Sequence, residues 1–259
     1  MAVLPHLPEN KARITSVFGN VLQMDSTKKM VKKLAGAAAG TAAWVTNAEN
    51  EHRQELMSGL TVAEGVGLSS GLMRRYREAG QLLYVDRDCC SATGKSKVAA
   101  MFADWKELMV RLDVWHLMRR FARGVTTDGH ILYGPFMARL SLAIFEWDAE
   151  DSNLLRWAKQ PVDGSRPVTL SVKELARHCR RRTRGAEETE RLIHEVLDHF
   201  WEAKDTMGMA LLDQARTRHI CYTQCQHMAC IQDPPVVTLY TKAGEVTRGG
   251  IKLPIFRCA

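Results

Sequence analysis

Short apolar runs and amphipathic stretches alternate at the start of the chain. The mostly apolar run 21–24 has the length of a buried strand, and it leads into Asp25. The segment 40–46 is rich in Thr, Trp and Val and predicts a second strand. The segment 54–61 is ambiguous between strand and helix by its period. We interpret it as a third strand.

The alternation continues toward residue 120. Apolar residues at helical spacing predict a helix over 63–79, and the compact apolar run 82–85 predicts a strand that ends on Asp86. A second helix is expected over 97–107 and a further strand over 110–115. Three strands followed by helix, strand, helix and strand indicate an α/β fold, a mixed sheet with flanking helices.

Helical periods dominate residues 126–220, and a polar segment with Pro and Gly, 160–169, divides them as a loop. From 236 to 257 short β-like pieces are separated by glycines, which predicts a hairpin. The domains that we predict are 14–122 for the sheet, 123–230 for a mainly helical insertion and 231–259 for a C-terminal β-hairpin segment.

Composition limits the classes of function. The 259 residues are 46% hydrophobic and 25% charged, a balance typical of a folded soluble domain. The net charge of +7 favours a polyanionic partner such as nucleic acid. Seven cysteines at irregular spacing indicate reduced thiols inside a cell, and neither a signal peptide nor a membrane span is evident. We therefore expect a nuclear or cytoplasmic protein that is not secreted.

Asp25 and Asp86 are the most informative acids, because each follows an apolar run that we interpret as a buried strand. If the two strands are neighbours, both carboxylates emerge at one edge of the sheet and together hold Mg²⁺ or Mn²⁺, which prefer oxygen ligands. Taken alone, an Asp at a strand end is more often a turn former or a helix cap. Asp88 competes with Asp86, since residues two apart share a strand face.

Three segments in this order carry a resemblance. Residues 23–29, QMDSTKK, resemble the first-acid motif of Mutator-like transposases, and residues 83–90, LYVDRDCC, are similar to the strand that carries the second acid. Residues 112–120, LDVWHLMRR, resemble the segment with an aromatic–His pair and Arg that follows the second acid. The sequence of these segments is similar to that of a multi-copy group of transposase-derived vertebrate proteins. The similarity extends from about Val17 to the end of the chain.

This resemblance implies a ribonuclease-H-like core of the DDE type with a helical insertion. It implies metal-dependent cleavage and strand transfer at DNA phosphodiesters, with Asp25 and Asp86 as ligands. A third acid, usually Glu, is expected on a helix that would follow the last residues of this chain, so the site is predicted to be incomplete. The substitutes within the chain are Glu146, Asp148 and Glu150, for which a solvated acidic helix end is the preferred interpretation.

Residues near the second acid have open roles. Asp113 precedes His116 within the predicted strand; a catalytic role is open, and a structural contact is the preferred interpretation. Trp115 and His116 would support the site by orienting a ligand or DNA, whereas a buried core histidine is an equally good interpretation.

Basic residues lie close in sequence to the proposed acids and in one later cluster. Such side chains neutralise DNA phosphates, although a solvated helix end explains the later cluster equally well. The candidate DNA-binding residues are Lys28, Lys29, Arg119, Arg120, Arg123, Arg180, Arg181 and Arg182.

Soft metal ligands gather near the end of the helical region. They are His219, Cys221, Cys225, His227 and Cys230. Zinc sites usually join two close ligands to a second pair farther along the chain, and this cluster shows no such partner pair apart from the lone Cys258. Incidental reduced thiols are therefore the default interpretation.

The sequence leaves open whether the chain is an enzyme. The first hypothesis is a transposase-derived nuclease core that is impaired by the missing acid. The alternative is a non-catalytic DNA-binding or interaction protein derived from a transposon, and a zinc-binding module built on residues 219–230 is the third hypothesis. Assembly into a homo-oligomer is left open.

Overall fold

The structure of the chain is a computed structural model. The chain divides into two compact units, Met1–Asp113 (unit 1) and Val114–Ala259 (unit 2). The residues that it describes are 19–27, 44–61, 81–91, 94, 96–160 and 168–258. The predicted helix over 63–79, most of the predicted loop over 160–169, and the candidate DNA contacts Lys28 and Lys29 lie outside these residues. The predicted domain boundaries stay predictions.

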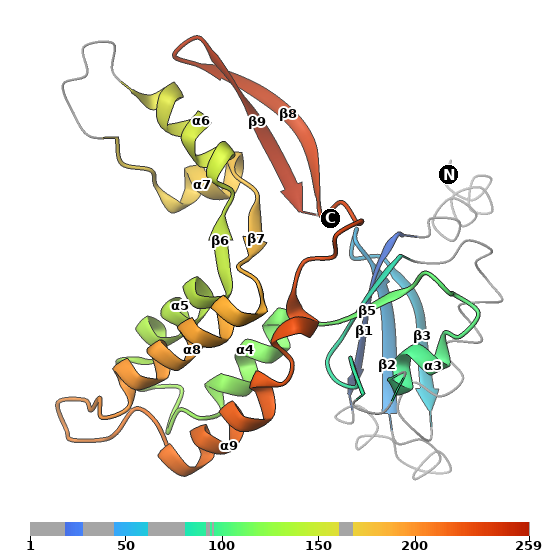
Figure 1. The fold of residues 1–259 in the computed structure, drawn as a ribbon, viewed down its shortest axis with the longest axis vertical. Helices are drawn as coiled ribbons and strands as arrows, with labels where there is room; N and C mark the ends of the chain where they lie inside the picture. The colour runs from blue at the N-terminus through green and yellow to red at the C-terminus, as the bar shows by residue number, and fades with distance from the viewer. Residues whose placement is uncertain are drawn as a thin grey trace, which may run out of the picture. The chain divides into compact units, whose positions relative to one another are not determined.

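Unit 1 contains a five-stranded mixed sheet in the order β3-β2-β1-β4-β5 (Figure 1). Its strands are β1 (Val21–Thr27), β2 (Trp44–Asn50), β3 (Glu55–Thr61), β4 (Leu82–Val85) and β5 (Met109–Leu112). β2 pairs antiparallel with β1 and β3, whereas β4 pairs parallel with β1 and β5. The described part of the chain therefore confirms the predicted α/β class with a mixed sheet.

Four predicted boundaries in unit 1 are wrong. β2 continues to Asn50, beyond the predicted end at residue 46. β1 continues to Thr27, so Asp25 lies within the strand and not at its exit. Helix α3 (Lys97–Met101), capped by the Ser96 hydroxyl, is shorter than the predicted 97–107. β5 ends at Leu112 and the next residues turn into helix α4 (Val114–Ala122), so Trp115 and His116 are helical. The period of α4 explains the change, because its buried positions, Leu117, Phe121 and Ala122, are spaced as on one face of a helix.

Unit 2 is mainly helical, as the periods over 126–220 predict, with two short strands that the sequence pattern did not indicate. Its helices besides α4 are α5 (Tyr133–Ile144), α6 (Ala149–Lys159), α7 (Val172–His178), α8 (Ala186–Phe200), α9 (Gln214–Cys225) and the 3-10 turn η4 (Met228–Ile231). The short strands β6 (Phe145–Trp147) and β7 (Arg181–Thr183) pair antiparallel.

The core of unit 2 holds α5 against α8. Phe136 of α5 is fully buried and meets Phe200 of α8 edge to face, with ring centroids 5.6 Å apart. Ile193 and Leu197 are buried on the same face of α8, at the spacing of an amphipathic helix. On the other side of α8, Glu187, Arg191 and Glu195 are exposed.

The predicted hairpin near the C-terminal end is confirmed by β8 (Tyr240–Arg248) and β9 (Ile251–Cys258), which pair antiparallel. Gly249 and Gly250 connect them with φ angles of 56° and 75°, values that favour glycine and suit a two-residue hairpin turn. Figure 1 shows the hairpin beside α6, and Leu253 of β9 is buried with Leu155 in a small core that includes Cys179.

No helix among the described residues is long and apolar enough to cross a membrane.

Candidate functional site

Three acids occupy matching register positions on three neighbouring parallel strands: Asp25 lies within β1, whereas Asp86 and Asp113 directly follow β4 and β5. The register pairs Met24 with Val85 and Val85 with Leu112, so the next positions are Asp25, Asp86 and Asp113. The backbone N–H of Asp113 donates to the Val85 carbonyl at 2.9 Å, which continues the ladder beyond β5. Residues in register share a sheet face. We call Asp25, Asp86 and Asp113 the acid row.

Polar residues lie next to the acid row. Gln23 of β1 donates through Nε2 to Asp113 Oδ2 at 2.8 Å, across the intervening strand β4. Arg87 Nε lies 3.5 Å from Asp86 Oδ2 and its guanidinium stacks over the Trp44 ring. Arg111, two residues before Asp113, carries a buried Nε for which the described residues provide no hydrogen-bond acceptor.

Asp88, the competitor for the second acid, has a different backbone. It is exposed and has a φ of 54°, in the left-handed region, so the extended strand has ended before it. Asp86 and Asp88 therefore do not share a strand face, and Asp86 is the residue that follows β4 in register.

The three substitutes for a third acid occupy the start of α6 and the strand before it. Glu146 of β6 forms ion pairs with Arg182 at 3.0 Å and Arg184 at 3.1 Å. Asp148 is the N-cap of α6, where Oδ1 accepts from the backbone N–H groups of Glu150 and Asp151. Glu150 lies in the first turn of that helix. These contacts show a structural use for Glu146 and Asp148.

The arginines of the later basic cluster are engaged within unit 2. Arg180 makes a bidentate ion pair with Asp151, at 2.8 and 3.1 Å. Arg181 donates to the Ser141 hydroxyl at 2.6 Å and lies 4.2 Å above the Phe145 ring, and burial lowers its pKa. Arg182 pairs with Glu146. This arrangement supports the structural interpretation of the cluster over phosphate binding.

Helix α4 presents a different basic surface. Trp115 is 58% exposed, and the Arg119 guanidinium stacks over its ring at 5.0 Å. His116 meets the same indole edge to face. Trp115, Arg119 and Arg123 line a surface pocket of about 390 Å³ with residues of α5. Arg120, by contrast, donates to the Gln224 side chain of α9 at 2.8 Å.

Two cysteines and one histidine come together on α8 and α9. Cys221 and Cys225 are one turn apart on α9, and their sulfurs are separated by 3.4 Å. His194 of α8 lies with Nε2 at 3.9 Å from the Cys221 sulfur and 3.8 Å from the Cys225 sulfur. The ligand atoms of these three residues all lie within 4.8 Å of one another. We call His194, Cys221 and Cys225 the thiol–imidazole group.

The two thiols of this group differ in acidity. A hydrogen bond from Cys225 lowers the pKa of the Cys221 thiol to about 7, assisted by the charge of the His194 imidazole and opposed by burial. The same hydrogen bond, together with burial, raises the pKa of Cys225. Cys221 is therefore the sulfur that more readily carries negative charge near neutral pH.

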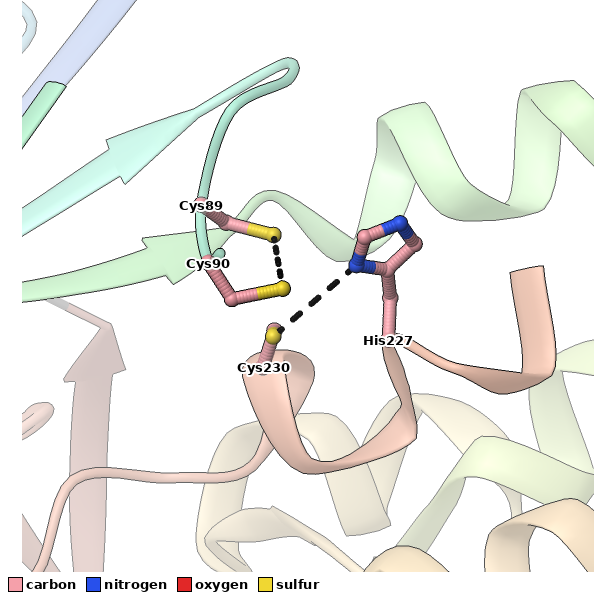
Figure 2. A group of neighbouring side chains, drawn as sticks. All are labelled: Cys89, Cys90, His227 and Cys230. Atoms are coloured by element: carbon pink, nitrogen blue, oxygen red, sulfur yellow. Dashed lines mark hydrogen bonds between the residues drawn. The ribbon is translucent and has the colours of Figure 1, made fainter. Parts of the chain in front are cut away.

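Two further pairs of soft ligands occur, one in each unit. Figure 2 shows Cys89 and Cys90, whose sulfurs are 3.9 Å apart just after β4 in unit 1. It also shows the Cys230 sulfur directed at His227 Nδ1, 4.0 Å away within unit 2. Either pair by itself supplies two ligands, fewer than the three or four protein ligands of a zinc site.

Comparisons of the chain with family models, with curated proteins and with solved structures give no match.

Sequence reasoning missed two features of these sites. One is the position of Asp113, which directly follows β5 and does not lie inside a strand, in the same relation to its apolar run as Asp86 has to β4. The other is His194, which the sequence does not connect with the cysteines, because it is far from them in the chain and lies on another helix. The i, i+4 spacing of Cys221 and Cys225 was the available signal for that group.

Proposed function

We propose that unit 1 is a ribonuclease-H-like core of transposase origin that acts on DNA phosphodiesters with divalent metal ions. The observation that carries the proposal is the parallel, in-register pairing of β1 with β4, which brings Asp25 and Asp86 to one edge of the sheet. The sheet order β3-β2-β1-β4-β5, with β2 antiparallel to its neighbours, supports the same assignment.

Asp113 is the candidate for the third acid in this proposal. It follows β5 in register with Asp86 and lies in unit 1 with the other two acids. Glu146 and Asp148 are less suitable, because each already pairs with arginines and Asp148 also caps a helix.

The donor set of the acid row fits Mg²⁺ or Mn²⁺, since carboxylate oxygens are the ligands that these hard cations prefer. In the described structure the three carboxylates do not form a group whose oxygens all lie within 4.8 Å. Asp25 is exposed and Asp86 is half-buried, so rotation of the side chains can bring their oxygens together.

The residues of this face have distinct roles in the proposed chemistry. Divalent metal ions would activate the attacking water or 3′-hydroxyl and stabilise the leaving oxygen. Asp25 and Asp86 would hold the ions at the sheet edge. Gln23 orients the Asp113 carboxylate through its hydrogen bond. Arg111 provides a positive charge on the same face, suited to a phosphate oxygen.

Cleavage of supercoiled plasmid and hairpin DNA with Mn²⁺ tests the proposal. Asp25→Ala, Asp86→Ala and Asp113→Ala should each reduce cleavage to the rate without protein. Asp104→Ala, which changes an exposed acid of unit 1 away from the row, should cleave like wild type. Folding of each variant is checked by circular dichroism.

Two results would count against the proposal. Cleavage that persists in the Asp25 and Asp86 variants would place the activity elsewhere or in a contaminant. The second is a well-folded wild-type protein that does not cleave DNA and shows no Asp25-dependent binding of Mn²⁺. Only a non-catalytic function would then remain.

DNA binding without cleavage is the second candidate function, and the surface of α4 favours it. An exposed Trp stacked with an Arg, beside a second exposed Arg, offers both a stacking surface and phosphate contacts. Arg119→Ala and Arg123→Ala should each weaken binding and reduce its salt dependence by about one phosphate contact. Arg182→Ala is the matched control, because that arginine is paired with Glu146. Equal losses in all three would argue against an α4 interface.

A further inference from the structure

We infer that His194, Cys221 and Cys225 form a zinc site on unit 2, with its fourth coordination position directed into the groove between α8 and α9. The inference rests on side chains of unit 2 alone and does not depend on the proposed function. Its ligands would be the two cysteine sulfurs and His194 Nε2.

The distances suit a tetrahedral ion before any movement of the backbone. Zn–S bonds of about 2.3 Å and Zn–N bonds of about 2.1 Å at tetrahedral angles separate the ligand atoms by about 3.6 to 3.8 Å. The sulfur–sulfur distance is 3.4 Å, and the two distances from Nε2 to the sulfurs are 3.8 and 3.9 Å. Adjustments of a few tenths of an ångström, within the reach of side-chain rotation, would complete the triangle.

The helices position these ligands independently of one another. Residues four apart on a helix lie on the same face, so α9 presents Cys221 and Cys225 together. The buried positions Ile193 and Leu197 fix the rotation of α8, and His194 is on the solvent side of that helix. A bound ion would therefore link two helices that are separated by a long connection in the chain.

The groove leaves room for a fourth ligand. It has a volume of about 830 Å³ and is lined by α8 and α9, including Glu190 and Asp198, one turn before and one turn after His194. Among the described residues, the group offers three ligand atoms. Zinc sites that keep one position for water or a substrate also have three protein ligands. The neighbouring carboxylates add negative charge that favours a cation there.

The donor chemistry selects the class of metal. Two thiolates and one imidazole favour Zn²⁺ over Mg²⁺ or Mn²⁺, which prefer oxygen. A disulfide between Cys221 and Cys225 would need a sulfur–sulfur distance near 2.05 Å, well below the 3.4 Å observed.

The test uses the full chain, purified under reducing conditions and stripped of metal with a chelator. Separate samples are titrated with Zn²⁺ and with Co²⁺. Bound metal is measured by elemental analysis. Co²⁺ also reports thiolate ligation through a charge-transfer band in the near ultraviolet. His194→Ala, Cys221→Ser and Cys225→Ser should each lose one equivalent of Zn²⁺ and the rise in melting temperature that Zn²⁺ produces.

Two controls separate this site from other thiols. His219→Ala removes an exposed histidine from α9, the helix that carries both cysteines of the group. Cys230→Ala removes a thiol outside the group. Neither should remove the equivalent that the His194 variant loses. His194 is exposed, so its variant should fold normally even if the cysteine variants do not.

Unchanged zinc content in a folded His194→Ala protein would overturn the inference. An equal loss in the His219 variant would overturn it as well. A cobalt spectrum that lacks thiolate charge transfer would also exclude the cysteines as ligands.

Discussion

The acid row and the thiol–imidazole group reach their positions in different ways. In unit 1 the backbone register of parallel strands fixes the acids, since Asp25, Asp86 and Asp113 continue the pairing of β1, β4 and β5. In unit 2 the ligands depend on helix rotation and packing, with His194 on α8 and the cysteines on α9. A site built on register follows from local patterns, whereas a site built between helices requires the tertiary structure.

The largest expected effect comes from breaking the helix packing. Phe136→Ala removes a fully buried ring that contacts Phe200 of α8 and should lower the free energy of unfolding of unit 2 by about 3–5 kcal/mol. The same change should weaken Zn²⁺ binding, because the position of α8 places His194. Chemical denaturation and zinc titration measure both effects.

Leu142→Ala is the matched control on the same helix. Leu142 is 52% exposed, so its truncation should cost no more than about 0.5 kcal/mol and leave zinc affinity unchanged. If the folded Phe136→Ala protein keeps the zinc affinity of wild type, the thiol–imidazole group does not depend on the packing of α8.

The sheet was predictable to the extent that its strands are short apolar runs. The bounds of β4 match the predicted 82–85, and β1 includes the predicted 21–24. Strand ends were less predictable, because β5 and α4 are joined with only Asp113 between them. Val114 and Trp115 suit either a strand or a helix by residue type, and only the burial of Leu117 and Phe121 decides for the helix.

A candidate site residue was predictable where the signal for it lies in its own short segment of sequence. Asp25 and Asp86 could be chosen because each follows its own apolar run. The pairing of Arg180 with Asp151 and of Arg182 with Glu146 could not be foreseen, since the partners lie on segments about 30 residues or more away. A cluster of arginines in a sequence therefore says little about which of them are available to a phosphate.

Asp148 offers a way to separate structural acids from the acid row. Asp148→Ala should lower the free energy of unfolding by about 1–2 kcal/mol, because it removes the N-cap of α6 and an ion pair with Arg180. It should leave metal-dependent cleavage unchanged. Glu150→Ala, at an exposed position of the same turn, should cost about 0.5 kcal/mol. Lost cleavage in the folded Asp148 variant would return it to the candidates for the third acid.

Glu174 contrasts with the acid row because it is an acid held by cations. Hydrogen bonds from Lys159 and Ser171 lower the pKa of Glu174 from 4.5 to about 2. Since the folded pKa is below the unfolded one, its stabilisation is complete above about pH 5 and is lost as the pH falls toward 2. We expect at most about 1 kcal/mol at pH 7 from this partly exposed group.

Unfolding of wild type and Glu174→Gln in denaturant, measured between pH 7 and pH 2.5, tests this expectation. The difference in free energy should be greatest at neutral pH and should shrink below pH 4.5. A difference that is constant over this range would show that the ionised carboxylate contributes nothing beyond the capping hydrogen bonds of α7.

The smallest effect concerns the acid row itself and has the opposite sign. Asp25 and Asp86 are neighbours in register, so their charges repel when no metal is bound. Asp25→Asn should therefore raise the free energy of unfolding without metal by about 0.5 kcal/mol. With saturating Mn²⁺ the order should reverse, because the metal stabilises only the protein that retains its ligand. Asp104→Asn is the control, and it should show neither effect. A loss of stability in the metal-free Asp25→Asn protein would mean that partners within unit 1 already satisfy this carboxylate, and the case for a metal site at this edge would then fail.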